Sequence, residues 1–193
     1  MSIQLSDNYQ TLAHTTSKET QIFGSKLLYP LFGLCGESGE ILEKMMSTKI
    51  DFSWTQFKEL MIKEAGDVTW YVAEVCTVLK IDMNTVCLVE GEDNGSLDFL
   101  SAASAVVLPV TKLLEKMKKL FRDGEAKITD ELIINNPDTI AMITKYLSEV
   151  MTNLDTFVKI FLSSTIKEVC EVNIEKLLSR KQRGVISGSG DNR

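Results

Sequence analysis

Two stretches of the sequence, GLCGESGEILEK at residues 33–44 and KEAGDVTWYVAEV at residues 63–75, decide how the chain folds. In both of them the apolar residues recur every three or four positions, which is the period of a helix with one buried face. The same period extends over nearly the whole chain, strand-like alternation is scarce, and three prolines interrupt it, Pro30, Pro109 and Pro137. The sequence therefore predicts an all-α protein.

The helical period sets the expected elements. Pro30 and Pro137 stand where a proline comfortably starts a helix, whereas Pro109 lies inside a helical pattern and should kink or break it. The polar stretch at 122–138 is expected to be a long connection with a turn of helix. The expected helices cover residues 7–27, 30–47, 54–80, 83–91, 98–122, 137–162 and 164–181.

Length and composition predict one domain. A chain of 193 residues that is 44% hydrophobic can bury one good core and is too short for two independent ones. We place the domain at residues 1–182, with halves at about 1–94 and about 95–182. The stretch GEDNGS at 91–96 is the expected joint. The tail at 183–193 has little to bury and is expected to be flexible.

Charge and hydropathy exclude several kinds of partner. The net charge of −6 provides no basic surface of the kind that binds nucleic acid. There is no secretory signal and no run of roughly 20 apolar residues that could span a membrane, so we expect a cytoplasmic protein. The cysteines form no CxxC pair and are expected to be reduced core residues: Cys35, Cys76, Cys87 and Cys170.

His14 is the single histidine of the sequence. This largely excludes Ser-His-Asp and Cys-His catalysis, zinc hydrolase sites and the histidine motif of di-iron bundles. Any chemistry must therefore rest on carboxylates, lysines, arginines and hydroxyls.

Paired carboxylates are the chemical signal in the two stretches. Glu37 and Glu40 lie three residues apart in the first stretch, and Glu64 and Asp67 lie three apart in the second. This spacing puts both members of a pair on one face of a helix, where their like charges repel. A bound cation would offset that repulsion. A single pair of this kind is more often a solvated helix surface, and that alternative stays open for each pair taken by itself.

Glycines accompany the carboxylates. Gly33, Gly36 and Gly39 in the first stretch and Gly66 in the second lie inside otherwise good helices, where each costs about 1 kcal/mol relative to alanine. Small residues would let the two helices approach closely and bring four carboxylates together. Such an oxygen-only ligand set suits Mg²⁺, with Mn²⁺ as a substitute, and bound Mg²⁺ commonly completes its coordination with substrate phosphates. The pattern therefore predicts a polyphosphate substrate.

Together the two stretches resemble the ExxE, spacer, ExxD signature of MazG-like nucleotide pyrophosphohydrolases. These enzymes belong to the all-α nucleoside triphosphate pyrophosphatases and are related to dimeric dUTPases. The resemblance includes the glycines before Glu37 and Asp67 and the aromatic pair that follows. It covers residues 31–90 and returns at NIEKLLSRKQRG, residues 173–184, which is similar to the family's NxxKLxxR segment. It implies a MazG-like helical bundle.

The resemblance implies an Mg²⁺-dependent enzyme that hydrolyses nucleoside triphosphates to monophosphates and pyrophosphate, in nucleotide pool sanitation or control. The catalytic and metal-binding residues would be Glu37, Glu40, Glu64 and Asp67. One of them, Glu37 or Glu40, would orient or deprotonate the attacking water.

Substrate contacts are implied in the same way. Lys176 and Arg180 lie four residues apart and share a helical face, as a triphosphate clamp requires, with Asn173 and Lys44 as further candidates. Taken alone, a basic helix end is more often a solvated cap. The aromatic residues that could stack on the base are Phe52, Trp54, Trp70 and Tyr71, although such residues are more often core. His14 could also face the nucleotide, although a satisfied surface or core histidine is more common.

Two weak internal repeats suggest a duplication. ILEKMMSTK at 41–49 resembles LLEKMKKLF at 113–121 with an offset of 72, and VCLVE at 86–90 resembles VCEVN at 169–173 with an offset of 83. Short helical segments also resemble each other by chance, so both explanations stay open.

If the repeats are real, the second half has lost the acidic pair and the first half has lost the basic segment. With the first offset, Glu37 and Glu40 correspond to Pro109 and Lys112. With the second offset, Asn173, Lys176 and Arg180 correspond to Glu90, Asp93 and Leu97. One chain would then build a single composite site from both halves.

Other functions remain open. The nearest is an enzyme of the same fold with narrow specificity, such as a dUTPase-like enzyme. A non-catalytic helical module that binds a nucleotide or a partner is a different class, and a helical regulator acting through an apolar surface is a third. We expect a homodimer or higher homo-oligomer, and the sequence reveals neither the preferred base and sugar nor the pathway.

Overall fold

The computed structural model describes residues 3–47, 53–87, 98–123 and 129–185. Over these residues the chain forms eight helices and no strand, so the predicted all-α class is confirmed. The helices are α1 (Tyr9–His14), α2 (Leu28–Met46), α3 (Trp54–Val78), α4 (Met83–Val86), α5 (Phe99–Asp123), α6 (Asp130–Ile134), α7 (Pro137–Leu162) and α8 (Ile166–Gln182).

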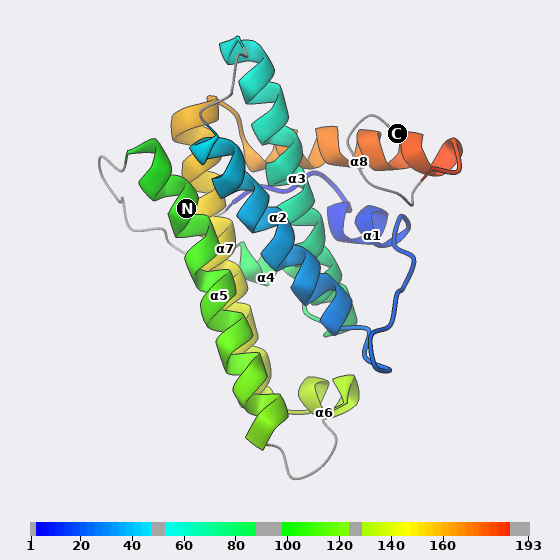
Figure 1. Ribbon diagram of the computed structural model, residues 1–193. Coiled ribbons are helices and arrows are strands. Elements are labelled where there is room, and N and C mark those ends of the chain that lie inside the picture. Colours follow the sequence, from blue (N-terminus) through cyan, green and yellow to red (C-terminus); the bar gives the residue numbers. More distant parts are fainter. Residues whose placement is uncertain (1–2, 48–52, 88–97, 124–128, 186–193) are drawn as a thin grey trace.

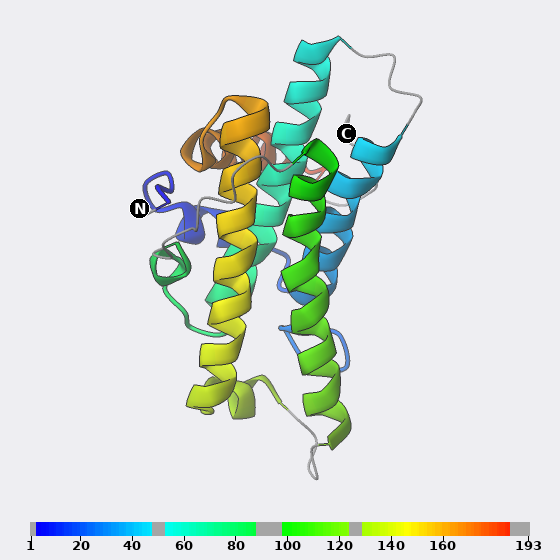
Figure 2. The same ribbon diagram turned by 90° about the vertical axis from the view of Figure 1, so that its left-hand side faces the viewer.

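Four long helices form the body of the molecule (Figures 1 and 2). α2 and α3 form one antiparallel hairpin, α5 and α7 form another, and the hairpins join through contacts of α2 with α5 and of α3 with α7. α8 crosses α3, and α1 lies against α3 and α8 (Figure 1). The shared core includes fully buried side chains from all four long helices, such as Leu34, Val72, Leu113 and Leu147.

Local sequence fixes where the long helices begin. Ser53 and Thr165 start α3 and α8 with capping boxes, in which the cap and the residue three positions later satisfy each other's backbone amides. Asn136 caps α7 directly before Pro137. The five expected helices that correspond to α2, α3, α5, α7 and α8 agree with the structure to within two residues at each end.

The prediction of a helix over residues 7–27 is wrong. α1 is a short helix that ends at His14, directly before Thr15 and Thr16. The hydroxyls of Thr15 and Thr16 donate back to carbonyls of the last helical turn, which gives the backbone an alternative to further helix. Glu19 and Gly24 then adopt φ values of 47° and 82°, outside the right-handed helical region. The segment between α1 and α2 is consequently a loop.

The expected break at Pro109 does not occur, and α5 runs through this residue. The proline nitrogen cannot donate to the carbonyl of Ala105, one turn earlier. Asn153 of α7 donates its side-chain amide to that oxygen at 2.7 Å. The neighbouring helix therefore satisfies the group that the proline leaves free.

The connections agree with the sequence where they are described. The stretch at 122–138 contains α6, whose Asp130 accepts hydrogen bonds from the Ser25 hydroxyl at 2.5 Å and the Lys26 amide at 2.6 Å. The expected helix at 83–91 begins as α4. Its end, the joint at 91–96 and the tail beyond residue 185 lie outside the described residues.

The cysteines are free, as predicted, and three of the four are buried. None of the helices within the described residues combines the length and the apolar composition that spanning a membrane requires.

Candidate metal centre

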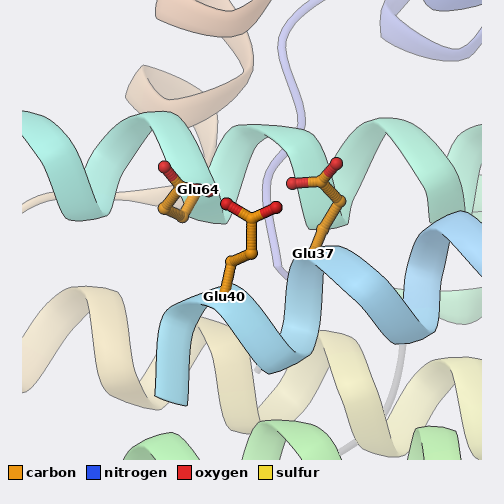
Figure 3. Close-up of side chains that lie close together, drawn as sticks. All are labelled: Glu37, Glu40 and Glu64. Atoms are coloured by element: carbon orange, nitrogen blue, oxygen red, sulfur yellow. The ribbon is translucent and has the colours of Figure 1, made fainter. Parts of the chain in front are cut away.

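The acidic side chains of α2 and α3 meet between these two helices (Figure 3). Glu37 and Glu40 project from α2 and Glu64 from α3, and each offers a carboxylate oxygen within 4.8 Å of the others. Three of the four predicted ligands therefore converge. Their helical spacing explains this, because residues three apart on α2 lie on the face that α3 covers.

The oxygens of the three glutamates fit a small divalent cation. Mg²⁺ holds oxygen ligands at about 2.0–2.1 Å, so ligands on opposite sides of one ion are about 4.2 Å apart. The observed limit of 4.8 Å is close to that span, and Glu40, whose side chain is 49% exposed, has room to adjust. Carboxylate oxygens suit hard cations, and the donor set by itself does not select Mg²⁺ over Mn²⁺ or Ca²⁺.

Lys44 neutralises part of this cluster. Its ammonium group donates to Glu64 at 2.6 Å and to Glu40 at 2.9 Å. The Glu64 side chain is 3% exposed, and a buried carboxylate needs such a counter-charge. Burial lowers the pKa of Lys44, but the hydrogen bonds to the two glutamates outweigh it and the pKa is raised. A cation bound by these glutamates would therefore compete with a fully charged ammonium group.

Asp67 lies beside the three glutamates but is held by α8. Lys176 donates to both carboxylate oxygens of Asp67 at 2.7 Å, and the side-chain amide of Asn173 donates to Asp67 at 3.0 Å. Asn173 is fixed in turn by the hydroxyl of Tyr9, which donates to its oxygen at 3.0 Å. Asp67 is not in the group of three, and its role as a metal ligand stays a prediction.

The basic segment of α8 thus reaches the acidic hairpin, as the composite arrangement requires. The side chain of Lys176 is 14% exposed. Arg180, one turn further along α8, is more deeply buried at 5% exposed. Lys176 is therefore the better placed of the two to meet a ligand.

Glu37 has the most perturbed carboxyl group of the cluster. Burial, followed by the negative charges of Asp67, Glu40 and Glu64, raises the pKa of Glu37 to about 7, and the charge of Lys176 opposes this. A carboxyl group that titrates near neutral pH is suited to accept a proton from water. The four acids and the lysine therefore form one electrostatic unit.

Two of the predicted glycines permit close contacts. A Cβ atom at Gly33 would lie 2.0 Å from the ring of Tyr71, and one at Gly66 would lie 2.9 Å from the Cβ of Asn173. Gly33 thus lets Tyr71 lie against α2, and Gly66 lets α8 approach α3. The other two glycines of α2 have nothing within 4 Å, so helix approach does not explain them.

Tyr71 is the predicted aromatic residue that lies at the centre. Burial and a hydrogen bond with Tyr29 raise its pKa, and the charges of Glu37 and Asp67 act in the same direction. The phenol is therefore neutral at physiological pH.

The remaining aromatic candidates lie elsewhere. Trp70 donates its indole N–H to the Ala13 carbonyl at 3.2 Å and holds α1 in place. Trp54 precedes Glu64 by ten residues, about 15 Å along α3, and stacks on Phe57. Phe52 lies outside the described residues.

Sequence reasoning missed Tyr9 and Glu74. Tyr9 is 1% exposed and carries no pattern that marks it as polar support. Glu74 is a buried carboxylate on α3, with one of its oxygens 3.2 Å from Nδ1 of His14. It follows Asp67 by seven residues, a spacing that places both on one helical face. That signal could have found it.

Known proteins show limited similarity to this chain. A curated protein, the "Gene 37 protein" of Mycobacterium phage L5, is 33% identical over 103 residues, which cover 51% of this chain and 83% of that protein. No protein-family model matches the chain, and no solved structure matches it. The name of the phage protein states no activity.

Proposed function

This chain belongs to the family of the Gene 37 protein of Mycobacterium phage L5, and from its acidic centre we propose that it is a cation-dependent nucleoside triphosphate pyrophosphohydrolase. The cation is Mg²⁺, and the products are a nucleoside monophosphate and pyrophosphate. Because the family name gives no activity, the proposal rests on the residues of this chain and on their resemblance to MazG-like enzymes.

One observation carries the proposal. Three glutamates from two helices converge within 4.8 Å, and Lys176 from a distant part of the sequence reaches the adjacent Asp67. Carboxylates that converge and repel each other are costly for a purely structural helix pair. A cluster of acids with cationic groups at its edge is suited to a polyphosphate that arrives with divalent cations.

Each residue has a distinct role in this proposal. Glu37, Glu40 and Glu64 hold the cation, which supplies positive charge to the phosphate oxygens and lowers the pKa of water. Glu37 or Glu40 orients or deprotonates the attacking water. Lys44 and Lys176 exchange their carboxylate partners for phosphate oxygens as the substrate enters.

The test is a panel of ribo- and deoxyribonucleoside triphosphates incubated with Mg²⁺, with products separated by chromatography. We expect monophosphate and pyrophosphate, lost in Glu40→Gln and Asp67→Asn. Glu43→Gln is the matched control, because Glu43 is exposed on the same helix. Turnover confined to one base would indicate a narrow, dUTPase-like specificity. Diphosphate and phosphate as products, or full activity in both variants, would refute the proposal.

A further inference from the structure

A cavity of about 270 Å³ lies further along the same pair of helices. It is open on one side and is bordered by the end of α1, the loop that follows it, the start of α2, the second half of α3, and α6. Its lining includes His14, Tyr29, Glu74 and Asp130. Its volume is just below the range of about 300–1,000 Å³ that is usual for small-molecule sites, so it suits one part of a larger ligand.

Glu74 is the unusual member of this lining. It is 4% exposed, and within the described residues its carboxylate meets one partner, Nδ1 of His14, at 3.2 and 3.4 Å. A carboxylate can accept about four hydrogen bonds, and buried polar groups are normally satisfied. Glu74 therefore retains acceptor capacity at the cavity wall.

The other charged groups of the lining are engaged with protein partners. Asp130 accepts hydrogen bonds from Ser25 and from the Lys26 amide. The ammonium group of Lys26 pairs with Glu19. Among the carboxylates of this lining, Glu74 is the buried one, and its contact within the described residues is with His14.

The distance of the cavity from the acidic centre matches the length of a nucleotide. Glu74 follows Asp67 by seven residues on one face of α3, a rise of about 10.5 Å. That is roughly the reach from the α-phosphate of a nucleotide to the far edge of its base. Tyr71 lies between the two places, close to Glu37 and Asp67, with its ring centroid 6.2 Å from that of Tyr29 at the cavity.

We propose that this cavity is the base subsite of the enzyme and that Glu74 makes it select guanine nucleotides. Guanine presents a ring N–H and an amino group side by side, which match the two oxygens of a carboxylate. Uracil and thymine present carbonyl oxygens on both sides of a single N–H, and a carboxylate repels them. Adenine and cytosine place an acceptor beside their amine. The inference rests on the proposed function, since the acidic centre must hold the phosphates.

The experiment compares kcat/KM for GTP, ATP, CTP and UTP with Mg²⁺. We expect the wild-type protein to favour GTP over UTP by about 10- to 100-fold, as one bidentate pair allows. Glu74→Gln should lower kcat/KM for GTP by a similar factor, and kcat/KM for UTP should stay the same or rise, because the repulsion of its carbonyl oxygens is removed. Glu59→Gln, on an exposed residue of the same helix, should retain the preference. A wild-type protein without preference, or a preference that survives Glu74→Gln, would overturn the inference and leave the hydrolysis itself intact.

Calorimetric titration with GMP separates this inference from the proposed function. GMP should bind the wild-type protein, and binding should weaken in Glu74→Gln and in Tyr29→Ala. If Glu74→Gln does not fold, Tyr29→Ala still tests the subsite. Tyr29 is 37% exposed, so its substitution should leave the fold intact. If no triphosphate is hydrolysed, the proposed function fails, and the GMP titration still decides the subsite. No GMP binding to the wild-type protein would overturn it.

Discussion

The two helical hairpins of this molecule have the same architecture and bury different groups. α2 pairs with α3 as α5 pairs with α7, and the outer contacts are reciprocal, since α8 lies on α3 and α4 lies on α7. The first hairpin buries Glu64 at 2% exposed, whereas the position 83 residues later is Leu147, at 0% exposed. At this position one hairpin thus buries a carboxylate and the other an apolar side chain. The acidic hairpin needs cations for this, and it takes Lys44 from itself and Lys176 from the other half.

The helix bounds can be compared with the offsets of the predicted duplication. α2 shifted by 72 residues covers 100–118, which falls within α5, and α3 shifted by 83 residues covers 137–161, which falls within α7. Common ancestry of the halves stays a prediction. The positions that correspond to the basic segment of α8, at 90, 93 and 97, lie outside the described residues.

Removing one buried carboxylate of the first hairpin should have the largest effect on activity. Glu64→Gln retains shape and a hydrogen-bonding oxygen but removes a negative charge from the centre. We expect kcat to fall by about 10²- to 10³-fold, as for loss of one preorganised charge-stabilising group. Steady-state pyrophosphate release measures this. Glu115→Gln, on α5 of the second hairpin, is the control and should stay within twofold of wild type.

Truncating the corresponding core residue should affect stability instead. Leu147→Ala removes a fully buried side chain and should lower the free energy of unfolding by about 2–5 kcal/mol. Urea unfolding measures the loss, and kcat below the transition should be unchanged. A variant of normal stability and low activity would contradict the division of roles between the hairpins.

Removing the contact between Lys176 and Asp67, which joins the two halves at the site, should have an intermediate effect on activity. Lys176→Met removes the ammonium group that holds Asp67 and should lower kcat/KM by about 10- to 100-fold through lost phosphate binding. Lys181→Met is a suitable control, because that lysine bonds the Thr15 carbonyl. Unchanged nucleotide affinity in Lys176→Met would remove the basis of the composite site.

The raised pKa of Glu37 gives the cation-free protein a pH dependence. Its ordinary value is 4.5 and its folded value is about 7, mainly because of burial. Between these values the folded state binds more protons than the unfolded state, so stability falls as pH rises. Glu37→Gln removes this fall. The Tm of this variant relative to that of wild type should therefore rise between about pH 5 and about pH 8. Thermal unfolding in a chelator measures the difference, and a constant gap would contradict the assignment.

Substitutions of two glycines of α2 should have the smallest effects on stability. Gly36 faces open space, so Gly36→Ala should stabilise the protein by about 1 kcal/mol through helix propensity. Gly33→Ala should destabilise it by about 1–3 kcal/mol, because the new methyl group meets the Tyr71 ring. Chemical denaturation gives both values. A stabilised Gly36→Ala that has lost activity would show that this glycine makes room for substrate.

The sequence predicts the long helices well, because their apolar period and caps are local properties. It fails at 7–27, where threonine hydroxyls and left-handed residues end α1 early. It does not reveal that α5 continues through Pro109, where Asn153, a residue distant in sequence, satisfies the carbonyl that the proline leaves free. A helical period carries no information about such tertiary hydrogen bonds.

The candidate site is predictable only where it depends on local helical spacing. The spacing of the acids predicts that they converge, and three of them do. Nothing in the spacing predicts that Lys176 would pair with Asp67, because the crossing of α8 over α3 depends on Gly66 and Asn173 in contact. The sequence offers Trp54 as a candidate to stack on the base because it is aromatic. Its place ten residues before Glu64 puts it about two to three helical turns away.

Direct titration of Mn²⁺ tests the central claim that the first hairpin holds a divalent cation. Calorimetry at about pH 8, where Glu37 is ionised, should detect binding to the wild-type protein and to Glu115→Gln. The account predicts that Glu64→Gln, folded normally by circular dichroism, loses that binding by at least about tenfold in affinity. Wild-type protein that does not bind Mn²⁺, or binding that Glu64→Gln leaves unchanged, would contradict the account.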